Sequence, residues 1–123
     1  MSKKQQADPS KLSTEERYDF FVETVVEEQA LWSLFGNDGW VLLTADQDTC
    51  IPFWPSEAIA KQMATQEWQG REAKRVELAA WKERWVTGLN EDEILVSIFP
   101  NHHDNGTIDE PENLLLVLEA MEE

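Results

Sequence analysis

The chain has 123 residues, of which 41% are hydrophobic and 28% charged, a composition typical of one globular domain and not of a disordered or fibrous chain. Its 25 acidic and 10 basic residues give a formal net charge of -15, which repels nucleic-acid phosphates and anionic lipid. No apolar run approaches the ~20 residues that cross a bilayer, and the single cysteine excludes an intrachain disulfide, so we expect a cytoplasmic protein that binds neither nucleic acid nor membrane.

The first predicted element is a helix over residues 14–28, preceded by a disordered leader over residues 1–12. The leader is polar and contains one proline, and chain ends of this kind are seldom ordered. Ser13 and Glu16 have the spacing of a capping box. Apolar side chains then recur at intervals of three and four residues, at Tyr18, Phe21, Val22, Val25 and Val26. Residues 13–123 are predicted to form a single globular domain that begins with this amphipathic helix.

A β-hairpin is predicted next, because two apolar segments, residues 30–35 and 40–45, flank the turn sequence Gly-Asn-Asp-Gly at 36–39. If Phe35 pairs with Trp40, the strands have two distinct faces. The face expected to form the core carries Trp32, Leu34, Val41 and Leu43, and the opposite face carries Leu31, Ser33, Leu42 and Thr44. A third strand over residues 50–54 contains Pro52, which cannot donate a ladder hydrogen bond, so this strand is predicted to lie at an edge or to be irregular.

The second half of the chain predicts two more strands and three helices. A short helix begins near Ser56 and a half-exposed strand covers residues 72–78. A helix over residues 79–86 carries Trp81 and Trp85 on one face and is expected to stop at Gly88. The apolar run 94–99 is typical of a strand buried in the middle of a sheet.

A polar loop, 102–106, then leads to a last helix that begins at Pro111. Its expected buried stripe is Leu114, Val117, Leu118 and Met121. The predicted order is αβββαβαβα, an α+β domain with a mixed or mainly antiparallel sheet and helices packed against it.

An ordered set of tryptophans, prolines and glycines resembles a known family. The set comprises Trp32, Gly39-Trp40, Pro52-Phe53-Trp54-Pro55, Trp68, Trp85, Gly88-Leu89, Val96, Phe99-Pro100 and Pro111. It is similar to that of the small bacterial proteins grouped as domain of unknown function 2750, from about Ser13 to the end of the chain. The resemblance implies a bacterial, cytoplasmic protein and brings no catalytic residues with it.

Metal binding and nucleophilic catalysis are the first chemistries to weigh. Neighbouring His102 and His103 tend to point apart in an extended segment, and with Asp104 they supply too few convergent ligands for zinc, so we interpret them as a solvated loop. Cys50 stands in an apolar strand and is expected to be a buried, inert thiol. The chain has neither a Gly-x-Ser-x-Gly motif nor a glycine-rich phosphate loop. We therefore expect no catalytic residue, metal or cofactor.

Six tryptophans are many for this length, and most are expected to fill the core. The alternative is an aromatic pocket or interface near Trp40, Trp54 and Trp68, with His102, His103 or Asp104 as its polar groups. Trp54 lies between two prolines and is the tryptophan expected to be partly exposed.

The charge is uneven, because residues 91–123 hold 10 acidic residues and no basic one. Half of the basic residues lie between Arg71 and Arg84, where they are expected to protect an exposed sheet edge, or else to contact an acidic partner such as a second copy. The leading functional hypothesis is a non-catalytic acidic domain, monomeric or a small homo-oligomer, that binds a basic protein partner. The alternative is a small-molecule-binding domain or enzyme with a Trp-lined cleft.

Overall fold

The structure, a computed structural model, describes residues 8–122. The first helix, α1 (Thr14–Glu28), begins at a complete capping box: the Ser13 hydroxyl accepts from the Glu16 amide and the Glu16 carboxylate accepts from the Ser13 amide. Of the predicted leader, residues 1–7 lie outside the described residues. The remaining part differs from the prediction, because Pro9–Lys11 forms a 3₁₀ turn that Asp8 caps and that buries Ser10.

The described strands form two sheets, in agreement with an α+β domain. One has the order β2-β1-β5, with β2 (Gly39–Trp40), β1 (Ala30–Gly36) and β5 (Glu72–Glu77) all antiparallel. The other has the order β3-β4-β6-β7, with β3 (Leu43–Ala45), β4 (Asp48–Phe53), β6 (Leu95–Ile98) and β7 (Thr107–Asp109), and only its β4–β6 pair is parallel. The predicted central position of β6 is confirmed, whereas the short β7 was not predicted.

The hairpin has the predicted register, since Phe35 pairs with Trp40. Its second strand, however, does not stay in one sheet: β2 pairs with β1, the chain crosses over at residues 41–42, and β3 pairs with β4 in the other sheet. The predicted division into one core face and one outer face is also wrong. Leu31, Ser33 and Leu34 are all fully buried, because β1 is central in its sheet and both of its faces are covered.

The strand containing Pro52 was predicted to lie at an edge or to be irregular, and the first alternative is wrong, because β4 is central in its sheet. Trp54 donates its backbone N–H to the carbonyl of Trp32 at 2.7 Å, on the side of β4 away from β6. Alternate residues of a strand direct their amides to the same side, so the missing N–H of Pro52 faces this side too. On this side the neighbouring strand is β3, and its last pair with β4 is Leu43 with Cys50. Pro52 therefore has no strand residue opposite its nitrogen, and no ladder hydrogen bond is lost.

The predicted stop at Gly88 is wrong as well. The helix runs without a break through α3 (Leu78–Ala80), a π-helical segment (Trp81–Trp85) and α4 (Val86–Glu91). It continues past Gly88 because Leu89 is buried in the core, which offsets the roughly 1 kcal/mol that a helical glycine costs. The last helix, α5 (Pro111–Met121), buries Leu114 and Leu118 as predicted, but Met121 is 46% exposed.

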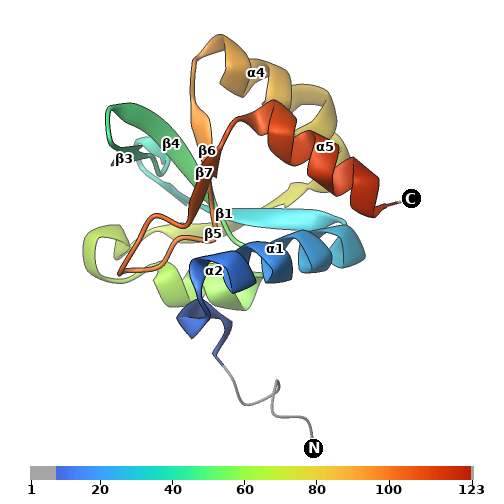
Figure 1. The fold of residues 1–123 in the computed structure, drawn as a ribbon. Coiled ribbons are helices and arrows are strands. Elements are labelled where there is room, and N and C mark those ends of the chain that lie inside the picture. Colours follow the sequence, from blue (N-terminus) through green and yellow to red (C-terminus); the bar gives the residue numbers. More distant parts are fainter. Residues whose placement is uncertain (1–7, 123) are drawn as a thin grey trace, which may run out of the picture.

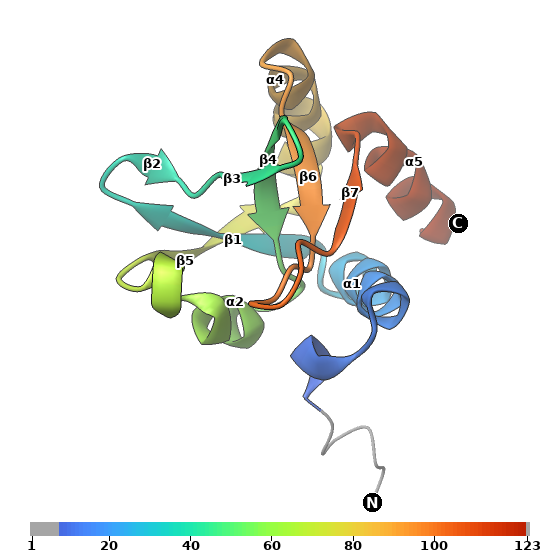
Figure 2. The same cartoon turned by 60° about the vertical axis from the view of Figure 1, so that its left-hand side comes forward.

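The helices enclose the sheets from two sides. Helix α1 and α2 (Glu57–Met63) lie on one side of β1 and β5, and α4 and α5 lie on the other side (Figure 1). The strands β4 and β6 run across the direction of β1 (Figure 2), and the largest buried side chains, among them Trp54, Trp81 and Phe53, lie in the core. None of the helices in residues 8–122 combines the length and the apolar character that crossing a membrane requires.

Candidate functional site

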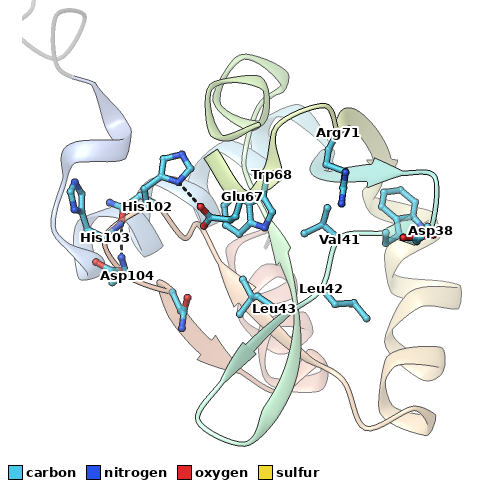
Figure 3. A pocket seen from close by; sticks show the side chains of 14 residues that line it. Asp38, Val41, Leu42, Leu43, Glu67, Trp68, Arg71, His102, His103 and Asp104 are labelled. Carbon is cyan, nitrogen blue, oxygen red and sulfur yellow. Dashed lines mark hydrogen bonds and ion pairs between the residues drawn. The ribbon is translucent and has the colours of Figure 1, made fainter. Parts of the chain in front are cut away.

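A pocket of about 630 Å³ opens where the chain crosses from one sheet to the other. One wall is the crossing segment, from Asp38 to Leu43, and the other walls are the turn after α2 and the loop after β6 (Figure 3). Five of the six residues that the sequence singled out line this pocket, namely Trp40, Trp68, His102, His103 and Asp104. They belong to three separate segments of the chain, which only the tertiary fold brings together.

Trp54 does not line the pocket, and the prediction that it is partly exposed is wrong. Its side chain is fully buried, and its indole N–H donates to the carbonyl of Pro100 at 2.9 Å. It supports the pocket from beneath, because its ring packs edge-on against Trp68 with centroids 5.6 Å apart. Trp68 in turn contacts His102, with centroids 5.8 Å apart. The three rings form a column from the core to the pocket.

His102 is held by the turn after α2, so it is not the solvated residue that the sequence predicted. Its Nε2 lies 3.0 Å from the hydroxyl of Thr65. Its Nδ1 is 3.8 Å from a carboxylate oxygen of Glu67, too far for a hydrogen bond, so this nitrogen has no partner among the described residues. The side chains of His102 and His103 point apart (Figure 3), and His103 is exposed, as predicted.

The loop that carries the histidines is shaped by Asn101. The side-chain oxygen of Asn101 accepts from the amides of His103 and Asp104, at 2.8 and 2.9 Å, and its side-chain nitrogen donates to the carbonyl of Ser10 at 2.8 Å. The carboxylate of Asp104 accepts from the amide of Gly106 at 2.8 Å. These bonds join the loop to the 3₁₀ turn before α1 and fix the direction of its side chains.

Arg17 anchors the same loop, and the sequence reasoning missed it. Its side chain is only 2% exposed and forms an ion pair with Asp104. Its guanidinium also donates to the carbonyls of Phe99 and Leu12, at 2.9 and 2.8 Å. One signal could have found it: Arg17 stands four residues before Phe21, on the apolar stripe of α1, where a basic residue needs a buried partner.

Arg71 also lines the pocket, although sequence reasoning did not assign it there; it follows Gly70 and lies at the end far from the histidines (Figure 3). Its side chain lies across the backbone of Gly36, where an added Cβ would come within 2.5 Å of the Arg71 Cδ. Gly36 therefore leaves the space that Arg71 occupies. Its closeness to Gly36 depends on the path of the turn after α2, which the local sequence pattern does not reveal.

Two further predictions concern reactive groups. Cys50 is fully buried, and burial raises the pKa of its thiol, with a smaller contribution from Asp48, so the thiol is inert at neutral pH. Within residues 8–122, no three His, Cys, Asp or Glu side chains are grouped so that they could hold a metal ion.

A second surface feature is the acidic face of α1 and α5, two helices that contact each other. Exposed acidic residues on α1 are Glu15, Glu16, Asp19, Glu23, Glu27 and Glu28. On α5, Glu112 and Glu119 are exposed and stand beside Leu116, which is 64% exposed, and Met121. Glu122, just after α5, pairs with Lys82. The face therefore combines negative charge with apolar side chains that the fold does not cover.

Two basic residues, Lys74 and Arg75, lie on β5 at the edge of its sheet. Lys74 lies over the ring of Phe35, at 5.1 Å from its centroid, and Arg75 lies over that of Trp32, at 6.0 Å. Two copies of the protein could pair their β5 strands antiparallel, with the symmetry axis between Lys74 and Arg75. Lys74 of one copy would then lie opposite Arg75 of the other, and the repulsion between like charges disfavours this pairing. The expectation that basic residues protect an exposed edge stays a prediction.

Comparison with curated proteins finds no match. Comparison with protein families finds one whose description is "Protein of unknown function (DUF2750)", and its model matches residues 18–118. The match extends over most of the chain and includes the crossing segment, the turn after α2 and the loop that together surround the pocket. On this evidence the chain belongs to the DUF2750 family.

Proposed function

We propose that this protein is a non-catalytic interaction domain that binds a basic protein partner through α5 and the neighbouring surface of α1. The observation that carries the proposal is the exposure of Leu116, 64%, on a helix whose charged residues are all acidic. A lone exposed leucine is common on protein surfaces, but Leu116 stands between Glu112 and Glu119 with Met121 nearby. An apolar centre with a charged rim is the usual composition of an interface.

The charge of this face selects the partner. The acidic residues of α1 and α5 attract a basic surface and steer its approach, while they repel nucleic acid and anionic membranes. We place the interaction in the bacterial cytoplasm, which the family resemblance and the single buried thiol support.

The partner that fits is an amphipathic basic helix, so the probe is a synthetic peptide of about 14 residues with leucines and lysines at helical spacing. Calorimetric titration is expected to show binding that weakens as salt is raised, because exposed charges are screened beyond ~8 Å at physiological ionic strength. Leu116→Gln removes the apolar contact and is expected to cost about 1–2 kcal/mol, or roughly 5- to 30-fold in Kd.

Leu42→Gln is the matched control, because Leu42 is 49% exposed but lies outside α5. This variant tests whether the peptide binds other exposed apolar residues non-specifically. A peptide with glutamate in place of lysine tests whether binding needs the basic charge. Equal affinities of the Leu116→Gln variant and the unmodified protein would contradict the proposal, as would a Kd that does not depend on salt.

A second candidate function, binding of a small molecule, is favoured by the pocket itself. Its volume of about 630 Å³ lies within the range of ligand sites, ~300–1,000 Å³. Tryptophan fluorescence reports on it directly, since Trp40 and Trp68 line it. Ligands that quench the unmodified protein and leave a variant with both Trp40→Phe and Trp68→Phe unchanged would support this function, and quenching that persists in this double variant would count against it.

A further inference from the structure

The end of the pocket beside the β1–β2 hairpin holds two opposite charges that do not pair with each other. Arg71 and Asp38 both line the pocket and are both exposed. Among the described residues, neither side chain takes part in an ion pair. Because no described residue neutralises either charge, both side chains are available to the charged groups of a ligand.

The backbone explains why the two charges share this end. Asp38 belongs to the turn that joins the paired residues Gly36 and Gly39. The side chain of Arg71 lies on Gly36, so that an added Cβ there would be 2.5 Å from its Cδ and 2.8 Å from its Nε. Arg71 is thus placed against the same turn that carries Asp38, and both residues lie toward this end in Figure 3.

The wall next to this end is apolar. Val41 is 7% exposed and Trp68 8% exposed, and Leu43 is partly buried. Small parts of these side chains face the pocket and offer a surface for an apolar group of a ligand.

The signs of the charges restrict the ligand. A simple anion that reached Arg71 would meet the carboxylate of Asp38 and the net charge of -15, and a simple cation that reached Asp38 would meet Arg71. A ligand with both charges a few bonds apart satisfies both side chains at once.

We propose that this end of the pocket binds a zwitterionic α-amino acid with an apolar side chain. Arg71 binds the carboxylate, Asp38 accepts from the ammonium group, and Val41, Leu43 and Trp68 contact the side chain. The inference rests on the second candidate function and names its ligand class.

The test compares three probes that share a phenyl ring and differ in charge: L-phenylalanine with both charges, 3-phenylpropionate with the carboxylate alone, and phenethylamine with the ammonium group alone. Binding is followed by tryptophan fluorescence at millimolar probe concentrations. L-phenylalanine is expected to bind at least about tenfold more tightly than either analogue, because each lost charge-assisted hydrogen bond weakens binding by this order.

Two variants assign the roles. Arg71→Gln is expected to weaken L-phenylalanine about tenfold or more without weakening phenethylamine, and Asp38→Asn is expected to weaken L-phenylalanine without weakening 3-phenylpropionate. Arg84→Gln is the control, since Arg84 is exposed and does not line this pocket. All these positions are at the surface, and a thermal melt verifies that each variant is folded.

The possible failures can be told apart. An analogue with one charge that binds as tightly as L-phenylalanine, with quenching that depends on Trp68, overturns the zwitterion and leaves small-molecule binding standing. The absence of any fluorescence change with all three probes overturns the inference, and a wider ligand screen then decides the second candidate function.

Discussion

Replacing Arg17 by methionine should destabilise the protein strongly, because this buried guanidinium joins three parts of the chain. It donates to the carbonyls of Phe99 and Leu12 at 2.9 and 2.8 Å and pairs with Asp104. Methionine fills similar space but donates no hydrogen bond, so both carbonyls lose their charged donor. Each unsatisfied buried group costs about 1–3 kcal/mol, and loss of one partner of a buried ion pair costs about 3–5 kcal/mol.

The exposure of Asp104 limits how much stability the loss of the ion pair removes. Asp104 is 45% exposed, so its share is closer to that of a surface pair, about 0–1 kcal/mol. We therefore expect Arg17→Met to lower the free energy of unfolding by about 3–4 kcal/mol, and Asp104→Asn to lower it by about 1 kcal/mol. Arg17→Lys should also be destabilising, since one ammonium group cannot reproduce three N–H donors in a fixed plane.

The assay is urea unfolding followed by tryptophan fluorescence, with the free energy of unfolding extrapolated to water. Arg84→Met is the control, since Arg84 is exposed and surface substitutions stay within about 0.5 kcal/mol. A loss below about 1 kcal/mol for Arg17→Met, or a larger loss for Asp104→Asn than for Arg17→Met, would refute the reasoning.

Three further predictions concern single sites. Gly106 has a φ of +68° and an added Cβ would lie 2.2 Å from a backbone oxygen, so Gly106→Ala should lower the free energy of unfolding in urea by more than about 2 kcal/mol. At Gly88 an added Cβ meets nothing within 4 Å, so Gly88→Ala should raise this free energy by about 0.5–1 kcal/mol. The reverse order of the two variants would contradict both predictions. Burial raises the pKa of the Cys50 thiol, so the folded protein keeps this proton to higher pH than the unfolded chain. The associated stability is present below the ordinary thiol pKa and is lost as the pH rises through the raised pKa of the folded protein. A Cys50→Ala variant that loses the same stability at alkaline pH would disprove this. His102→Ala should cost about 1 kcal/mol and His103→Ala at most about 0.5 kcal/mol in thermal melts, and a zinc-dependent rise of the midpoint that the double variant lacks would show that a metal site was missed.

Several elements followed from the sequence because their causes are local. The capping box of α1 joins residues three positions apart, and the pairing of Phe35 with Trp40 follows from the turn between them. The strand β6 was predictable because a strand buried on both faces needs apolar residues on both. In each case the decisive interaction lies within a few residues or in the composition of one segment.

Other elements were decided by neighbours that the local pattern does not show. Pro52 is tolerated in a central strand because β3 ends before it. Gly88 lies inside a helix because Leu89 packs into the core. Trp54, despite its flanking prolines, is buried because Pro100 accepts its indole N–H.

The candidate site divides in the same way. Aromatic and polar residue types pointed to Trp40, Trp68, His102, His103 and Asp104, but not to their meeting in one pocket. That pocket exists because the chain changes sheets after β2, and its loop is held by a hydrogen bond between Arg17 and Phe99, 82 positions apart. Local propensity and periodicity act over a few residues, so the sequence by itself determined the α+β class and most of the elements, but not β7 or the change of sheet after β2. The tertiary structure decided which side chains face the pocket, because only packing brings distant segments within hydrogen-bond distance.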